Sequence, residues 1–166
     1  MRIVVIGIGQ SLRGDDAAGL EAVRLWQAKY PGTAGGVRVE LTELPGLGLL
    51  DLLAGAEAAI LVDAVQADPP AGKLLRIGPE ELASFTTDTQ SAHGWGVAET
   101  LILGRSMDPG LAQIRVTPIG IVGRDFSMGS GLSPEVKEAL PRAAEIIEVE
   151  VMKCDADEHG QTRNEE

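Results

Sequence analysis

Two short and almost wholly apolar runs constrain the fold of this 166-residue chain more than any other feature. The first reads RIVVI at residues 2–6, and the second reads AAILVDAV at residues 58–65. Continuous apolar runs of this length are typical of parallel strands that are covered on both faces. Parallel neighbours need crossover connections, which are usually helices. The chain is therefore expected to adopt an α/β fold.

Strand-like and helix-like segments alternate along the chain. The predicted strands are residues 2–6, 37–41, 58–65, 73–77 and 112–122. The predicted helices are residues 18–30, 47–53 and 95–105. A last helix is predicted to begin at Ser133-Pro134. Residues 79–83 predict a helical turn, and residues 85–90 predict a loop. This order predicts a three-layer α/β/α architecture, with a mostly parallel twisted sheet and helices on both faces.

The length of the chain corresponds to one domain. Residues 1–153 are predicted to form a single α/β domain. Residues 154–166 read CDADEHGQTRNEE, a polar sequence that predicts a flexible C-terminal tail.

Charge and cysteine content narrow the classes of partner and compartment. The chain has 25 acidic and 14 basic residues and a net charge of −11, which opposes binding to nucleic acid. No uninterrupted apolar run approaches the roughly 20 residues of a membrane span, so no membrane partner is expected. The single cysteine, Cys154, cannot form an internal disulfide, and this favours the reducing cytoplasm.

The acidic residues and the histidine that follow predicted strands are the candidate functional residues, because ligands of such sheets bind beyond the carboxyl ends of the strands. Asp15 and Asp16 follow the first strand, Asp63 lies near the end of the third, and His93 precedes the helix at 95–105. A lone carboxylate within an apolar strand is costly to bury without a partner. Two carboxylates and an imidazole would suit zinc, nickel or a similar divalent ion.

Each of these candidates also has a purely structural explanation. An acidic pair at a helix start commonly caps the helix, although two acids exceed what one cap needs. Asp15 is therefore expected to bind backbone groups while Asp16 points into the crevice. His93 lies between Ala92 and Gly94, where histidines are commonly satisfied loop residues.

Two phosphate-binding motifs do not match the first turn. The dinucleotide fingerprint that begins with Gly7-Ile8-Gly9 requires a glycine where this chain has Leu12. A P-loop requires Gly-Lys-Ser/Thr, whereas residues 14–16 read GDD and would repel phosphate. The glycines are therefore expected either to permit a tight turn or to allow close approach of a substrate.

The sequence offers weak candidates for a nucleophile. Ser11 lacks a nucleophile-elbow motif, and Cys154 belongs to the predicted tail. An aspartic dyad of Asp16 and Asp63 that shares a proton is chemically feasible, but it would leave His93 without a role.

Residues 7–19 (GIGQSLRGDDAAG), Asp63, His93 and residues 131–136 (GLSPEV) together resemble the hydrogenase maturation endopeptidase family. The resemblance spans about residues 2–150. It implies a soluble, single-domain α/β/α protease that removes a C-terminal extension from the large subunit of a nickel-iron hydrogenase after nickel insertion. Two residues depart from the family pattern, since Gln10 replaces the usual Asn and Ala17 a frequent Gly.

The resemblance also implies the roles of the candidate residues. The metal-contacting positions of the family fall on Asp16, Asp63 and His93, which would recognise the nickel already bound in the precursor, so no permanent cofactor is expected. We expect these three residues to serve catalysis, with water attacking a nickel-polarised carbonyl and a carboxylate acting as base. Two other functions remain open: a non-catalytic nickel checkpoint or chaperone that binds the precursor, and a small-molecule α/β enzyme or dinucleotide binder.

Overall fold

The computed structural model describes residues 1–43, 46–67, 70–76, 90–91 and 97–161. The strands are β1 (Ile3–Ile8), β2 (Arg38–Thr42), β3 (Ala58–Gln66), β4 (Leu74–Arg76), β5 (Gln90–Ser91) and β6 (Arg115–Val122). The helices are η1 (Gly14–Ala17), α1 (Ala18–Lys29), α2 (Pro31–Gly35), α3 (Gly48–Leu53), α4 (Val97–Met107), α5 (Pro109–Ala112) and α6 (Pro134–Gln161).

The strands form one sheet in the order β2-β1-β3-β6-β4, and β5 pairs with β3. β1 runs parallel to β2 and β3, and β3 runs parallel to β6. Only β4 and β5 are antiparallel to their neighbours among the described strands. The predicted mostly parallel sheet is therefore confirmed, and the carboxyl ends of β1, β2, β3 and β6 share one edge.

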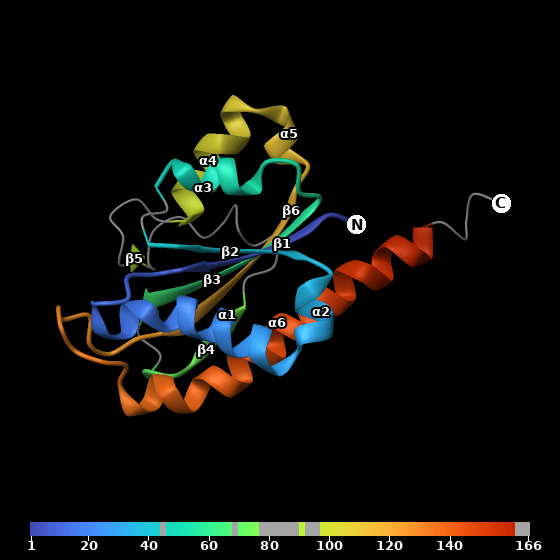
Figure 1. Ribbon diagram of the computed structural model, residues 1–166. Coiled ribbons are helices and arrows are strands. Elements are labelled where there is room, and N and C mark those ends of the chain that lie inside the picture. Colours follow the sequence, from blue (N-terminus) through green and yellow to red (C-terminus); the bar gives the residue numbers. More distant parts are fainter. Residues whose placement is uncertain (44–45, 68–69, 77–89, 92–96, 162–166) are drawn as a thin grey trace.

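Helices α1 and α6 cover one face of the sheet (Figure 1). Val5 and Ile60 point toward this face from the strands, and Trp26 and Ile147 meet them from the two helices. All four side chains are fully buried. The Trp26 indole also donates a hydrogen bond of 2.8 Å to Glu148, which ties α1 to α6.

The other face carries α3, α4 and α5 (Figure 1). Alternate strand residues such as Ile6 and Leu61 turn to this side and pack with Leu49, Leu53 and Leu101. Successive strand residues thus fill two separate cores, as the continuous apolar runs require. The predicted three-layer architecture is confirmed.

Three predicted boundaries are wrong or incomplete. Pro31 starts the short helix α2 rather than ending helical structure, because the first position of a helix needs no backbone N–H. Ala112 ends α5 rather than opening a strand, since the Asp108 side chain accepts a 2.8 Å bond from Gly110 N–H and caps that helix. Gln90 lies in β5 rather than in a loop, whereas residues 77–89 are outside the described part of the chain.

The last helix extends beyond Lys153, because α6 continues to Gln161. The Cys154 side chain is only 4% exposed and belongs to the core beneath α6. One turn later, Asp157 pairs with Arg115 at the start of β6. Packing and an ion pair therefore extend the helix into a segment whose composition is polar.

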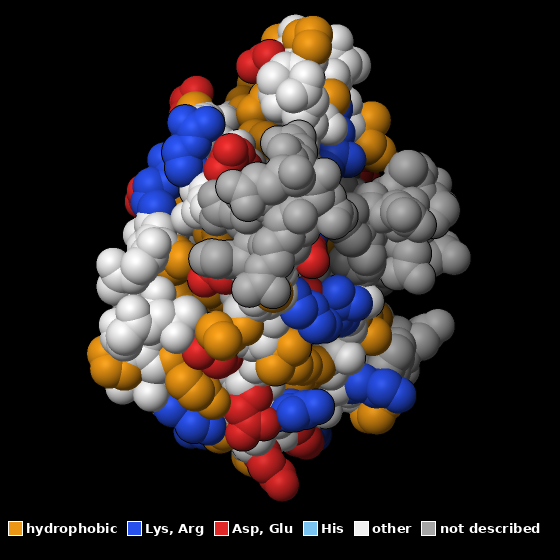
Figure 2. Space-filling view, turned by 90° about the vertical axis from the view of Figure 1, so that its right-hand side faces the viewer, with side chains coloured by type: hydrophobic (Ala, Val, Ile, Leu, Met, Phe, Trp, Pro, Cys, Tyr) orange, Lys and Arg blue, Asp and Glu red, His pale blue; other side chains and the backbone are white. Residues whose placement is uncertain are grey.

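The described surface carries both signs of charge. Among the described residues, no helix is long and apolar enough to cross a membrane. On the face that carries the chain termini, Lys and Arg side chains are interspersed with acidic and apolar ones (Figure 2).

A substitution at Cys154 tests whether the end of α6 is part of the core. We expect Cys154→Asp to lower the free energy of unfolding by about 1 to 3 kcal/mol, because the carboxylate loses its hydration at a position that is 4% exposed and the Arg115 guanidinium, which contacts Cys154, compensates only part of that loss. Met152→Asp is the control, since Met152 is 56% exposed on the same helix, and its effect should stay within about 0.5 kcal/mol. Urea denaturation measures both, and equal effects would contradict the packing of this segment.

Candidate functional site

The turn from β1 into α1 brings the chain very close to the end of the sheet. A Cβ atom at Gly19 would lie 2.2 Å from the carbonyl oxygen of Val62 and 2.3 Å from that of Ile8. A Cβ atom at Gly9 would lie 2.0 Å from the carbonyl oxygen of Asp16. These glycines therefore allow the chain to approach itself, which supports the structural explanation of the Gly7-Ile8-Gly9 turn. The result is that η1 sits directly on β3.

Asp15 holds the loop between β6 and α6. Its Oδ2 atom accepts backbone N–H bonds from Arg124 at 2.7 Å and Asp125 at 3.0 Å, and its Oδ1 atom accepts one from Ser133 at 2.6 Å. Burial alone would raise the pKa of Asp15, but the three N–H donors outweigh it and lower that pKa below 3.8. Asp15 therefore binds backbone, as expected, but it does so in another loop and caps neither η1 nor α1.

Asp16 and Asp63 lie together beneath this turn. Asp16 is fully buried in η1, and Asp63 near the end of β3 is only 6% exposed. The Asp63 Oδ1 atom accepts a 2.8 Å bond from the N–H of Ala64. Burial raises the pKa of Asp63 well above its ordinary value, and the neighbouring charge of Asp16 raises it further. The structure thus brings together two of the three predicted site residues.

The other candidates are placed differently. His93 lies outside the described residues, so the structure describes only the carboxylates of the predicted set. In the described part of the chain, no group of three or more His, Cys, Asp or Glu residues is arranged to hold a metal ion. Ser11 is exposed and its hydroxyl donates to Glu43, and Cys154 is a buried free thiol.

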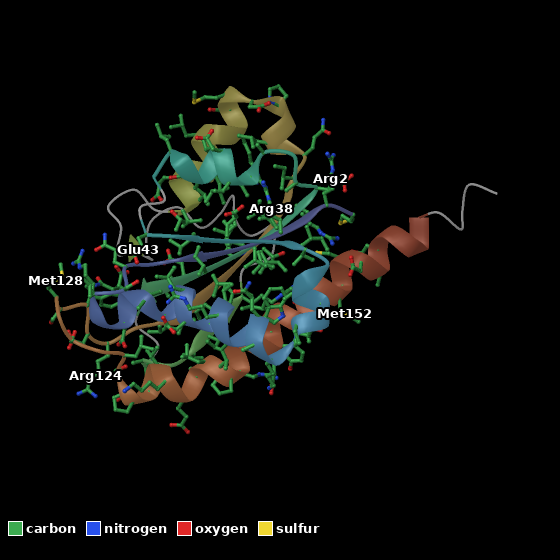
Figure 3. The ribbon with its side chains drawn as sticks, viewed as in Figure 1. Arg2, Arg38, Glu43, Arg124, Met128 and Met152 are labelled. Atoms are coloured by element: carbon green, nitrogen blue, oxygen red, sulfur yellow. The ribbon has the colours of Figure 1, made fainter. Side chains whose placement is uncertain are left out.

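The loop that follows β6 is absent from the candidates predicted from the sequence. Arg124 and Asp125 lie directly after the carboxyl end of this strand, and Arg124 also pairs with Glu135 of α6 at 2.8 Å. In Figure 3, Arg124, Met128 and Glu43 lie at one end of the molecule, opposite Arg2 and Met152. A polar turn that follows a buried strand is a signal that could have indicated this loop. Ligands of such sheets bind beyond the carboxyl ends of the strands, and this rule selected Asp15, Asp16 and Asp63.

Comparison with known proteins gives the family. A family model described as hydrogenase maturation protease matches residues 44–150. The chain belongs to this family. The Hydrogenase 2 maturation protease of Escherichia coli is 26% identical over 153 residues, which cover 89% of this chain and 88% of that protein.

Solved structures of the family support the fold of this member. The nickel-iron hydrogenase maturation protease HybD of Thermococcus kodakarensis matches with a TM-score of 0.76 at 29% identity, over 91% of this chain and 99% of that one. The maturating endopeptidase HybD of Escherichia coli matches with a TM-score of 0.72 at 24% identity, over 93% of this chain and 94% of that one. The overall fold is therefore that of solved maturation proteases.

The hydrogen bonds of Asp15 predict a pH-dependent loss of stability in Asp15→Asn. At pH 7 we expect this variant to be less stable by about 2 kcal/mol, because an amide cannot replace a carboxylate toward three N–H donors. The pKa of Asp15 is lower in the folded chain than its ordinary 3.8, so its contribution is complete above that pH and disappears as the pH falls below it. Urea titrations of both proteins at pH 7 and below pH 3.8 should show the difference shrinking, whereas a constant difference would contradict it.

Asp63→Asn should have the opposite effect on stability. The pKa of Asp63 is higher in the folded chain than in the unfolded chain, so ionised Asp63 disfavours the fold increasingly as the pH rises above 3.8. We expect the variant to unfold at a higher urea concentration than the unsubstituted protein at pH 8, and at a similar one below pH 3.8. Asp51→Asn, at an exposed position on α3, is the control and should shift neither midpoint. A destabilised Asp63→Asn protein at pH 8 would show that the carboxylate is not strained.

Proposed function

We propose that this protein is an endopeptidase that removes the C-terminal extension of a nickel-iron hydrogenase large-subunit precursor after nickel insertion. In this proposal, Asp16, Asp63 and His93 contact the nickel that the precursor carries. The observation that carries the proposal is the pair of buried carboxylates, Asp16 and Asp63, held at the carboxyl edge of the sheet in a member of this family.

The electrostatics of the pair support a cation as its ligand. Two buried carboxylates repel each other, and the raised pKa of Asp63 reflects both its burial and that repulsion. A divalent ion between them would replace the repulsion by attraction. Carboxylate oxygens and an imidazole nitrogen are suitable donors for nickel and leave positions free for the ligands that the precursor supplies. The nickel is thus part of the substrate, and the protein needs no resident metal.

The same arrangement suits hydrolysis of a peptide bond. Nickel polarises the carbonyl of the bond to be cut, and water adds to its carbon. A carboxylate of the Asp16 and Asp63 pair accepts the proton of that water and passes it to the leaving amine nitrogen as the C–N bond breaks.

The environment of the reaction follows from the composition. We propose that the protein acts in the cytoplasm on a protein substrate. Its only cysteine, Cys154, is a free thiol, which suits a reducing compartment. Its net charge of −11 opposes binding to nucleic acid.

Intact mass spectrometry of the cognate precursor, nickel-loaded and nickel-free, tests this function directly. Loss of a C-terminal peptide from the nickel-loaded form alone is the expected result. Cleavage of both forms would keep the protease and remove nickel recognition. Binding of the nickel-loaded form without loss of mass would instead establish the non-catalytic checkpoint.

Substitutions of the proposed ligands should separate processing from folding. We expect His93→Ala and Asp16→Asn to reduce the rate of processing at least about 100-fold, because each removes a group that contacts the nickel or moves the proton. His159→Ala is the matched control, since His159 lies in the last turns of α6, and processing should be unchanged. Normal processing by His93→Ala would refute the assignment of this ligand.

A further inference from the structure

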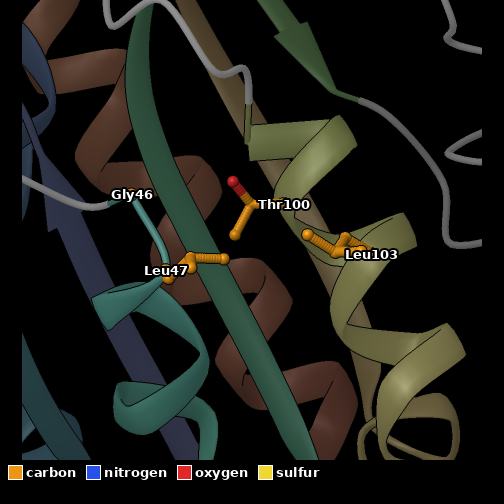
Figure 4. A pocket seen from close by; sticks show the side chains of 4 residues that line it. All are labelled: Gly46, Leu47, Thr100 and Leu103. Atoms are coloured by element: carbon orange, nitrogen blue, oxygen red, sulfur yellow. The ribbon is translucent and has the colours of Figure 1, made fainter.

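A pocket of about 260 Å³ opens between α3 and α4, and neither the fold nor the carboxylate site explains it. Gly46, Leu47, Thr100 and Leu103 line it. In Figure 4, the side chains of Leu47, Thr100 and Leu103 converge on a common space, and the Thr100 hydroxyl points away from Leu47. The described lining is therefore mainly aliphatic.

The packing of the two helices creates this space. A Cβ atom at Gly104 would lie 2.5 Å from the Leu50 side chain, so α3 and α4 touch closely at that glycine. Thr100 lies one turn earlier on the same face of α4, beyond the contact. The pocket lies between Thr100 of α4 and Leu47, the residue that precedes α3.

The size and lining of the pocket define its ligand. Pockets for whole drug-sized molecules are commonly about 300 to 1,000 Å³, whereas an apolar cavity of about 150 Å³ accepts benzene. At about 260 Å³, this pocket fits one aliphatic side chain of a larger ligand. Leu47 at its mouth is 60% exposed, so the described residues leave the pocket accessible.

The position of the pocket links it to the carboxylate pair. Leu47 follows β2, and α4 begins at Val97, four residues after His93 in the sequence. The pocket therefore lies on the α3 and α4 side of the edge at which Asp16 and Asp63 meet.

Charge around the pocket selects between partners. Three acidic side chains, Glu43, Asp51 and Glu99, are exposed on the segments that line it. Two basic side chains lie at the far ends of these helices: Arg38 donates to the carbonyl oxygens of Leu52 and Ala54 at the end of α3, and Arg105 is in the last turn of α4. A second copy of this chain, with its net charge of −11, would bring more negative charge to this rim. A neutral or basic peptide from another protein is the better match.

We infer that this pocket binds an aliphatic side chain of the precursor close to the bond that is cut, and that Leu103 selects the size of that side chain. The inference rests on the proposed function, because it takes the precursor as the peptide ligand. It assigns a specificity role to α4 that is separate from metal contact.

Enlarging the pocket tests this inference, because a misfolded variant would lose activity toward every substrate without changing its preference among side chains. The two residues that flank the cleaved bond of the nickel-loaded precursor are replaced in turn by Ala, Val, Leu and Phe, and kcat/KM for processing is measured by intact mass. We expect Leu103→Ala to shift the preference at one of these positions toward a larger side chain by about tenfold or more, as one methylene is worth in an apolar pocket.

Ile102→Ala is the matched control, because Ile102 is 44% exposed on the same helix and does not line the pocket. The control should keep the original preference. An unchanged preference in Leu103→Ala, or an equal shift in Ile102→Ala, would overturn the inference. The proposed function would still stand in that case, provided that the unsubstituted protein processes the precursor. If Leu103→Ala changes the oligomeric state instead of the preference, the pocket belongs to a dimer contact and the inference is wrong. If the unsubstituted protein neither binds nor shortens the precursor, the proposed function fails and this inference fails with it.

Discussion

Three backbone N–H groups converge on the Asp15 carboxylate, and the geometry of the carboxyl edge depends on that contact. The donors belong to Arg124, Asp125 and Ser133, more than 100 positions away in the sequence. Through them, the loop after β1 and the loop after β6 become one unit. Asp16 is the next residue of the chain, so the hold on Asp15 also determines where the Asp16 carboxylate lies relative to β3. A charged acceptor suits this task because its hydrogen bonds are stronger than those of a neutral group.

The neighbouring pair has the opposite energetics. Asp15 is stabilised as an anion by its donors, whereas Asp63 is held where its own ionisation is disfavoured by burial and by Asp16. A fold selected for stability alone would have no use for two carboxylates in this place. Strained charges of this kind are common at functional sites, where a ligand relieves the strain. The contrast between Asp15, whose carboxylate is stabilised by three N–H donors, and Asp63, whose pKa is raised by burial and by Asp16, supports the proposal of a cation at this edge.

The sequence predicted the features that follow from periodicity and strand ends. The apolar runs located β1 and β3, and the rule that ligands bind at the carboxyl ends of strands was enough to select Asp15, Asp16 and Asp63. Prediction failed where distant packing decides the outcome. The polar composition after Lys153 concealed the burial of Cys154 and the ion pair of Asp157, which extend α6. Likewise, nothing local in the sequence shows that Gly104 meets Leu50, and the pocket beside them depends on that contact.

The carboxylates proposed to contact the metal and the residues that line the pocket lie in different parts of the fold. Asp16 lies in η1 and Asp63 near the end of β3, at the carboxyl edge of the sheet. Leu47, Thr100 and Leu103 lie in or next to α3 and α4, which cover one face of that sheet. A substrate that used both would cross the carboxyl edge of the sheet, with its metal on one side and an aliphatic side chain on the other. Such a two-point attachment fixes the direction of the peptide as well as its position. Separate parts of the fold would then recognise the side chain, through α3 and α4, and contact the metal, through Asp16 and Asp63.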